Sequence, residues 1–317
     1  MNGLGVARVE GFEVSSVESE GLEPDALLQA GSVSKAVAAL VALRLVEQGL
    51  LSLDGDVNEQ LSSWRLPAAE PVTLRELLSH TAGTTVESFP GYAPGEPVPS
   101  LVEVLEGRAP ADTDPVRLEP EARGVHRYSG GGYAVVQALV ADATGHPFAT
   151  AAAELVLYPL GMGDSTFEQP LPDELQGRAA GPGNVYPEAA AAGLWTTPHD
   201  LAQFGSALQL AVAGRPSPVA RETAALMLLP HVQLGPREEY EQIRALGIVP
   251  PDHMGLGLFL VVRGGETARF GHIGTTNTFV AALDFSATDG TGAVAMANTH
   301  EAAEAVLRAV APAEAPA

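Results

Sequence analysis

The sequence predicts a mixed α/β (α+β) fold in which helices flank an antiparallel sheet built from both ends of the chain. Three observations predict it. Short alternating segments typical of strands lie near the N-terminus, similar segments recur after residue 255, and helical patterns fill much of the chain between them. Because the two sets of strands are expected to meet in one sheet, the middle of the chain is predicted to be an inserted helical subdomain.

The N-terminal segment Leu4–Ser16 is expected to form two short strands that turn near Gly11. Val33–Gly49 is predicted to be a helix of about four turns. Its residues are apolar on almost every side, which is typical of a helix in the protein interior, and its last residue can cap the C-terminus. Ser32 therefore lies at the N-terminal end of a buried helix.

Three further helices are predicted in the middle of the chain. Thr73–His80 begins with a threonine that has capping-box spacing to Glu76. Tyr133–Ala143 is apolar and precedes a glycine and a proline, and a third helix begins at Thr197 and covers roughly Thr197–Val212. Phe89–Pro120 is rich in proline, glycine and acidic residues, which predicts a long irregular loop.

Three strands separated by turns are predicted near the C-terminus, at Gly255–Val262, Thr276–Asp284 and Gly292–Asn298, followed by a closing helix at Glu301–Val310. We expect one catalytic domain over residues 1–310. Within it, residues 1–50 and 190–310 would form the α/β subdomain and residues 50–190 the helical subdomain, with a cleft between them. The proline- and alanine-rich residues 311–317 are expected to fray.

The composition excludes several classes of function. The 317 residues carry 17 basic and 39 acidic side chains, a formal net charge of −22, which opposes binding to nucleic acid and to anionic membranes. There is no cysteine, so disulfides and thiol chemistry are excluded, and no histidine pattern has metal-ligand spacing. No cofactor or metal is therefore expected. Without a recognisable signal peptide or membrane-spanning run, the chain is expected to be cytoplasmic.

Ser32 and Lys35 form the strongest candidate for chemistry. They have i, i+3 spacing at the start of a helix, so their side chains lie on one face. A serine hydroxyl is a weak nucleophile until a neighbour takes its proton, and a buried, neutral lysine can do so whereas arginine cannot. Lys35 is the only lysine in the chain, among sixteen arginines. The pair predicts a serine nucleophile with a lysine base.

Three motifs resemble those of the serine β-lactamase and penicillin-binding-protein superfamily. Ser32-Val-Ser-Lys35 resembles the first motif, Tyr128-Ser-Gly130 the second (Tyr-x-Asn), and His272-Ile-Gly274 the His-x-Gly form of the third, found in related esterases, aminopeptidases and transacylases. Smaller patches occur in the family's order, so the resemblance covers roughly residues 5–305. These patches are Leu74–Gly83, Leu160–Phe167 and Gly193–Leu201.

The resemblance implies a β-lactamase/transpeptidase-like fold and a role for each matching residue. Tyr128 would relay a proton to the leaving group, acting near neutral pH if Lys35 and the field of the site lower its pKa. His272 would lie on an edge strand facing the nucleophile and contact substrate or Tyr128. The backbone N–H groups of Ser32 and Thr275 would form the oxyanion hole. Gly130 and Gly274 would line the substrate site.

The sequence also departs from the family pattern. Gly130 replaces the asparagine of the second motif, and the third motif has no lysine to bind a substrate carboxylate. No acidic residue can be nominated as the deacylating base of a class A β-lactamase. These differences favour a less polar acyl substrate over a β-lactam. The chain also starts close to its first strand, so a helix common in the family is expected to be missing or shortened.

The predicted function is that of a serine hydrolase that forms an acyl-enzyme at Ser32 and hydrolyses an ester or amide of a small molecule or short peptide. An acyltransferase acting on a small metabolite is the nearest alternative, because the same acyl-enzyme serves both reactions. A binding module that has lost turnover is another alternative, suggested by Gly130. The acyl group, the acceptor and the oligomeric state stay open.

Overall fold

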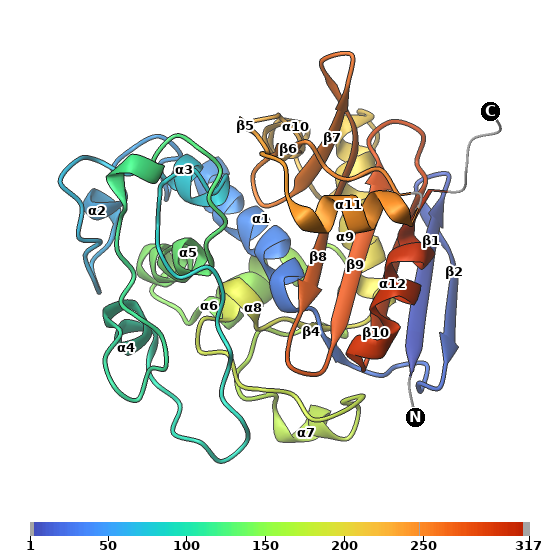
Figure 1. The fold of residues 1–317 in the computed structure, drawn as a ribbon, viewed down its shortest axis with the longest axis horizontal. Coiled ribbons are helices and arrows are strands. Elements are labelled where there is room, and N and C mark those ends of the chain that lie inside the picture. The colour runs from blue at the N-terminus through green and yellow to red at the C-terminus, as the bar shows by residue number, and fades with distance from the viewer. Residues whose placement is uncertain (1–2, 247, 313–317) are drawn as a thin grey trace.

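The computed structural model describes residues 3–246 and 248–312 (Figure 1). The strands are β1 (Leu4–Glu10), β2 (Glu13–Glu20), β3 (Leu28–Gln29), β4 (Trp195–Thr196), β5 (Val232–Gln233), β6 (His253–Met254), β7 (Phe259–Arg263), β8 (Glu266–Thr275), β9 (Val280–Ser286) and β10 (Gly292–Ala297). The main sheet has the order β2-β1-β10-β9-β8-β7-β6-β5, and every neighbouring pair in it is antiparallel. The predicted antiparallel sheet assembled from both termini is therefore confirmed.

The helices of the first half of the chain are η1 (Gly31–Val33), α1 (Ser34–Glu47), α2 (Val57–Gln60), α3 (Leu74–Leu78), α4 (Leu101–Glu106), η2 (Pro120–Ala122), α5 (Gly130–Thr144), α6 (Phe148–Ala152) and η3 (Ala153–Leu157). Those of the second half are α7 (Asp173–Gln176), α8 (Ala189–Ala192), α9 (Pro198–Val212), α10 (Arg221–Met227), α11 (Glu238–Ala245), η4 (His300–Ala302) and α12 (Ala303–Val310). None of the described helices is long and apolar enough to cross a membrane.

Helices cover both faces of the sheet. Along β10, Val294 and Met296 belong to the main core with α9, whereas Ala293 and Ala295 pack with Val306 of α12 in a second, smaller apolar cluster. Because side chains alternate across a strand, α9 and α12 lie on opposite faces. In Figure 1, α11 lies on the same side of the sheet as α12.

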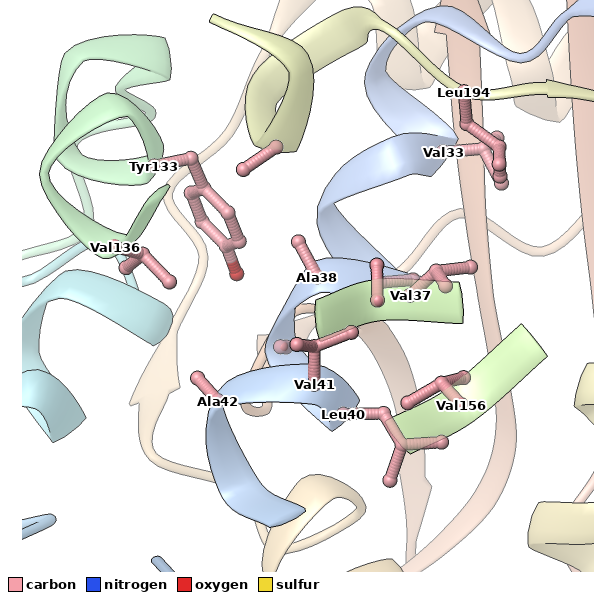
Figure 2. Close-up of a cluster of buried hydrophobic side chains, with 14 of the residues drawn as sticks. Val33, Val37, Ala38, Leu40, Val41, Ala42, Tyr133, Val136, Val156 and Leu194 are labelled. Carbon is pink, nitrogen blue, oxygen red and sulfur yellow. The ribbon is translucent and has the colours of Figure 1, made fainter. Parts of the chain in front are cut away.

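Helix α1 lies between the sheet and the helical part of the chain. Its side chains are buried on almost every side, as the sequence predicts. Val37 and Val41 lie in one apolar cluster with Tyr133 and Val136 of α5 and with Val156 of η3 (Figure 2). Burying an aliphatic side chain of this size stabilises the fold by about 1.5–3 kcal/mol. The start of α1 is therefore held firmly in the middle of the molecule.

The predicted loop Phe89–Pro120 is wrong in one part, because it contains α4. Ser100 and Glu103 form a capping box in which each side chain accepts a hydrogen bond from the other residue's backbone N–H, and Gly107 ends the helix at a φ of 59°. These start and stop signals are the ones expected of a short helix. In the sequence, the surrounding prolines and glycines made these helix signals hard to recognise.

The predicted C-terminal strands are shifted, and a strand between them was missed. Gly257 has a φ of 78°, so β7 begins only at Phe259. The backbone turns after β8, where the Thr276 hydroxyl accepts a 3.0 Å hydrogen bond from the N–H of Phe279, and β9 begins at Val280. The missed strand, β8, is the one that carries His272.

The expectation that His272 lies on an edge strand is also wrong. Strand β8 is internal, between β9 and β7. Its pairing with β7 stops at Gly271, opposite Phe259, whereas its pairing with β9 continues to Thr275. The last residues of β8 therefore pair with a neighbouring strand on one side only, although the strand itself lies inside the sheet.

Candidate active site

Ser32 lies in the 3-10 turn η1 and Lys35 is the second residue of α1. The Lys35 Nζ atom lies 3.1 Å from the Ser32 Oγ atom and donates a 2.8 Å hydrogen bond to the carbonyl of Ala191 in α8. Lys35 is 2% exposed. The predicted pair is thus brought into direct contact, with the amine held in place from a second helix.

The surroundings of Lys35 favour its neutral form. Burial lowers the pKa of Lys35 to about 7, against an opposing effect of the Glu188 carboxylate. A neutral amine can accept the proton of a hydroxyl, so Lys35 has the electrostatics of a base near neutral pH. Burial in the apolar interior, more than the N-terminus of the helix, is the cause.

Tyr128 faces the same pair. The Lys35 Nζ atom lies 5.0 Å from the centroid of the Tyr128 ring. Burial raises the pKa of Tyr128 well above its ordinary value, although the hydroxyl of Ser32 opposes the shift. The expectation of a lowered tyrosine pKa is therefore wrong, because loss of solvation outweighs the nearby positive groups. Tyr128 stays protonated and can donate a hydrogen bond.

His80 supports Tyr128 from behind. The backbone N–H of Ser129 donates a 3.1 Å hydrogen bond to His80 Nδ1, and the His80 and Tyr128 rings lie 4.4 Å apart. Burial lowers the pKa of His80 well below its ordinary value. Because Nδ1 accepts, the neutral ring carries its proton on Nε2, which is buried without a hydrogen-bond partner among the described residues.

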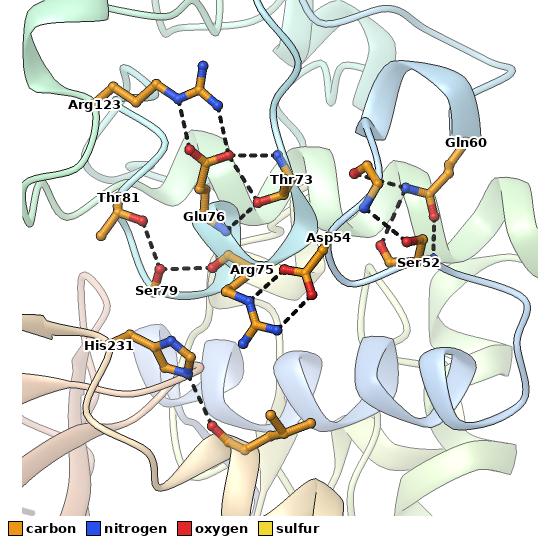
Figure 3. A network of polar contacts seen from close by, with 12 residues as sticks. Ser52, Asp54, Gln60, Thr73, Arg75, Glu76, Ser79, Thr81, Arg123 and His231 are labelled. Atoms are coloured by element: carbon orange, nitrogen blue, oxygen red, sulfur yellow. Dashed lines mark hydrogen bonds and ion pairs between the residues drawn. The ribbon is translucent and has the colours of Figure 1, made fainter.

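A polar network fixes the helix that precedes His80 (Figure 3). Thr73 and Glu76 form the predicted capping box of α3, and both carboxylate oxygens of Glu76 also accept hydrogen bonds from Arg123, at 2.8 and 3.1 Å. Arg75 forms a two-pronged ion pair with Asp54. The Arg123 contact joins α3 to the segment that leads into Tyr128, so the network holds the two together.

His272 approaches from β8. Its ring lies 6.2 Å from that of Tyr128, and its Nδ1–H donates a 2.7 Å hydrogen bond to the carbonyl of Ile273. The other ring nitrogen, Nε2, is therefore a bare acceptor, and it is buried with no partner in the described part of the chain. Burial lowers the pKa of His272 to about 3, with Lys35 adding to the effect. His272 is a neutral hydrogen-bond acceptor.

The end of β8 packs directly on the turn that carries Ser32. A Cβ atom on Gly274 would lie 2.0 Å from the carbonyl of Ala30 and 2.8 Å from the backbone nitrogen of Ser32. A Cβ atom on Gly31 would lie 2.8 Å from the backbone nitrogen of Thr275. Glycine at both positions permits this approach. The backbone nitrogens of Ser32 and Thr275 therefore both lie at the contact between η1 and the end of β8.

Gly130 is the first residue of α5, and a side chain there would be tightly packed. A Cβ atom there would meet the ring of Phe89 at 3.0 Å and the carbonyl of Glu87 at 3.2 Å. The space into which the family's asparagine would point is thus occupied by an aromatic ring. Gly130 donates its N–H to the Glu87 carbonyl at 2.8 Å.

Glu188 is a buried acid that the sequence analysis did not identify. It directly precedes α8, is 1% exposed, and neither carboxylate oxygen has a hydrogen-bond partner among residues 3–246 and 248–312. Burial raises the pKa of Glu188 to about 8, while the Lys35 ammonium opposes the shift. The sequence held no signal for this residue, since Glu188 is far from Lys35 along the chain and lies in no recognisable motif.

A cavity with aromatic and cationic lining adjoins His272, although none of Ser32, Lys35 and Tyr128 lines it. Phe259 lies 5.0 Å from His272 and 6.1 Å from Tyr128 between ring centroids. Phe259, His272 and Arg237 line a mainly apolar cavity of about 270 Å³ beside α11. Arg237 is half-buried, has no ion pair with any side chain that the structure describes, and its charge acts on Tyr128. Neither Arg237 nor Phe259 belongs to a motif that could be recognised in the sequence.

Of the predicted site residues, the structure brings together Ser32, Lys35, Tyr128, His272, Gly274 and Thr275, while Gly130 lies against Phe89. No group of three or more metal-ligating side chains was found in the described part of the chain.

The sequence is similar to a known protein family and to several characterised proteins. The family model described as Beta-lactamase matches residues 3–316. Esterase EstB of Burkholderia gladioli is 34% identical over 167 residues, which cover 48% of this chain and 41% of that protein. The D-alanyl-D-alanine-carboxypeptidase/endopeptidase AmpH of Escherichia coli K12 is 26% identical over 193 residues, 57% of this chain and 48% of AmpH. The matches thus span less than half the length of these relatives.

The fold also resembles that of solved structures from related proteins. The solved structure of a Beta-lactamase/D-alanine Carboxypeptidase from Yersinia pestis superposes with a TM-score of 0.73 at 18% identity, covering 97% of this chain and 90% of that one. At this identity the likeness concerns the fold alone. The β-lactamase/transpeptidase-like fold implied by the sequence motifs is confirmed.

Proposed function

The chain belongs to the Beta-lactamase family, and from this premise we propose that it is a serine hydrolase that forms an acyl-enzyme at Ser32 and cleaves an ester or amide of a small molecule or short peptide. The observation that carries the proposal is the 3.1 Å contact between Ser32 Oγ and a buried Lys35 amine whose pKa is lowered to about 7.

In the proposed acylation step, Lys35 Nζ takes the proton of the Ser32 hydroxyl as Oγ forms a bond to the acyl carbon. The backbone N–H groups of Ser32 and Thr275 stabilise the oxyanion. Tyr128, which stays protonated, donates its proton to the leaving oxygen or nitrogen and is reprotonated from Lys35. Water then attacks the acyl carbon while Lys35 takes one of its protons, the bond between the acyl carbon and Ser32 Oγ breaks, and Lys35 returns the proton to Oγ.

We further propose an ester carrying an apolar group as the preferred substrate class. The similarity to Esterase EstB supports the ester, and the apolar cavity beside Phe259 supports the apolar group. The wider family contacts β-lactams with an asparagine in the second motif and a lysine in the third. In this chain Gly130 replaces the asparagine, and the third motif has no lysine. Arg237 offers a cation from a different segment, which suits a substrate that also carries a carboxylate.

Labelling with a fluorophosphonate probe tests the nucleophile. The wild type is expected to form one covalent adduct, on Ser32, that is lost in Ser32→Ala. Ser34→Ala is the matched control, because Ser34 is a neighbouring serine on the same segment whose hydroxyl accepts a hydrogen bond from the N–H of Leu194. An adduct that survives in Ser32→Ala, or no adduct under any condition, would contradict the proposal and favour a binding module.

Product analysis separates hydrolysis from transfer. A p-nitrophenyl ester is incubated with and without amine and alcohol acceptors, and the released acid and the transfer products are quantified. Hydrolysis is expected to proceed without any added acceptor. If product appears only when an acceptor is present, the protein is an acyltransferase instead.

A further inference from the structure

Glu188 stands out among the buried acids of the molecule. It is 1% exposed, and both of its carboxylate oxygens lack a hydrogen-bond partner among the described residues. Asp200, which is also 1% exposed, accepts hydrogen bonds from Ser165 and from the N–H of Asp164. A buried acid without partners destabilises a fold, and native proteins seldom keep one without a use for it.

Glu188 belongs to the same piece of structure that holds Lys35. It directly precedes α8, and the carbonyl of Ala191 in that helix accepts the 2.8 Å hydrogen bond from Lys35 Nζ. Each of the two groups acts on the protonation of the other. One short helix thus links the backbone of Glu188 to the carbonyl that holds the Lys35 amine.

Among the titratable groups near Glu188 and Lys35, Glu188 is the acid whose charge acts on Lys35. Those that sense Glu188 are Lys35, Tyr92 and Tyr186. Those close to Lys35 are His80, His272, Tyr128 and Tyr133. The two histidines are held neutral by burial, and the tyrosines stay protonated because burial raises their pKa values. Within this set, only Glu188 changes charge in the same pH range as Lys35.

We propose that Glu188 is a positioning residue that controls the protonation state of Lys35 through its charge. When the carboxyl is protonated, the Lys35 amine is free to accept the Ser32 proton. When it is ionised, the carboxylate stabilises the ammonium form, so a smaller share of Lys35 is neutral at a given pH and able to act as a base. The protonation states themselves do not depend on the proposed function, but their consequence for catalysis rests on it.

The proton balance of acylation is unchanged by Glu188. The Ser32 O–H bond breaks, an N–H bond forms on Lys35, and Oγ bonds to the acyl carbon. When the bond to the leaving group breaks, Tyr128 supplies its proton and takes another from Lys35. Glu188 keeps its proton throughout and touches neither the substrate nor the reacting atoms.

The single lysine allows a direct test that needs no activity. Growth on lysine labelled with ¹³C at Cε gives one side-chain resonance, that of Lys35, whose shift against pH reports its protonation. In Glu188→Gln, which keeps the shape and removes the charge, the Lys35 pKa is expected to fall by about one unit or more. An unchanged Lys35 titration would overturn the proposal.

The wild type provides a second test in case Glu188→Gln does not fold. Because the two groups interact, the Lys35 resonance is expected to titrate in two steps, the second one reporting ionisation of the carboxyl. A curve that fits a single group would also overturn the proposal. Asp200→Asn is the matched control, since Asp200 is equally buried but its charge is not among the causes of the Lys35 pKa shift. The Lys35 titration in this variant should equal that of the wild type.

A catalytic readout connects this inference to the proposed function. The pH midpoint of the rise in kcat/KM is expected to move to lower pH in Glu188→Gln. This change should equal the change in the midpoint of the Lys35 titration curve. If the resonance shifts while the fluorophosphonate probe fails to label Ser32, the proposed function fails and the electrostatic control of Lys35 stands. If the probe labels Ser32 and neither curve shifts, only the role of Glu188 fails.

Discussion

The backbone N–H of Ser129 donates a 3.1 Å hydrogen bond to Nδ1 of His80, so the residue that follows Tyr128 is fixed to the turn after α3. His80→Ala is expected to lower kcat by about tenfold or more, because Tyr128 loses both this anchor and its ring contact. Steady-state kinetics with a p-nitrophenyl ester measure the change.

His80→Asn is the control for that variant. The Asn Oδ1 atom can accept the Ser129 hydrogen bond, and asparagine tolerates the φ of 56° at this position. It should retain more activity than His80→Ala. Wild-type kcat in His80→Ala would show that Tyr128 needs no support from His80.

The pH dependence of kcat/KM follows from the protonation of Lys35. Below its pKa of about 7 the amine is an ammonium and cannot accept a proton, so kcat/KM should rise through about pH 7 to a plateau. Burial raises the pKa of Tyr128, so no decline from loss of its proton is expected below about pH 10. A pH–rate profile measures both limbs.

His272→Gln tests whether a histidine causes the acid limb instead. The pKa of His272 is lowered to about 3, so the imidazole is neutral throughout the range and the limb should keep its midpoint in this variant. Loss of the limb in His272→Gln would assign the base to the histidine and contradict the role of Lys35.

Replacing Gly130 by the family's asparagine is expected to destabilise the fold because the ring of Phe89 lies close to that position. Gly130→Asn places a Cβ atom 3.0 Å from that ring, and such overpacking typically destabilises a protein by about 1–3 kcal/mol. Phe89→Ala should make room, so the double variant should be more stable than the sum of the two single effects predicts. Urea unfolding of the four proteins measures the coupling, and simple additivity would contradict the steric explanation.

Much of the fold and the central part of the site could be predicted from the sequence. The apolar helix after Ser32 and the strands at both ends carry strong local patterns, and the Ser32 and Lys35 spacing is itself local. Strand β8 was missed because Gly271 and Gly274 and the polar residues before them interrupt its alternation. The glycines are there because backbone from other segments approaches them, which is a tertiary cause.

Residues that act through distant contacts could not be predicted. Glu188 and Lys35 are brought together only when α8 packs on α1. Arg237 and Phe259 reach the site from segments that have no motif of their own. The raised pKa of Tyr128 has the same origin, because its burial depends on the packing of α5 and β8 and not on its neighbours in sequence.

Arg237 is predicted to discriminate between substrates by charge. Arg237→Gln should raise KM for the p-nitrophenyl monoester of succinate by about five- to tenfold, since one charge-assisted contact is lost, and leave p-nitrophenyl butyrate unchanged. Arg263→Gln is the matched control, because Arg263 is exposed and pairs with Asp252. Equal effects of Arg237→Gln on both esters would argue against a carboxylate site.

Glu188 should also make the free energy of unfolding fall as the pH rises. A carboxyl whose pKa is raised by folding stabilises the native state below its unfolded value of about 4.3, and that stability is lost as the pH rises through the folded value of about 8. Above that point Lys35 is neutral, and an ionised Glu188 would be buried without a compensating charge. Glu188→Gln should therefore gain stability relative to the wild type as the pH rises from about 4.3 to about 8, measured by urea unfolding. A difference that stays constant over this range would show that Glu188 is not buried as an acid.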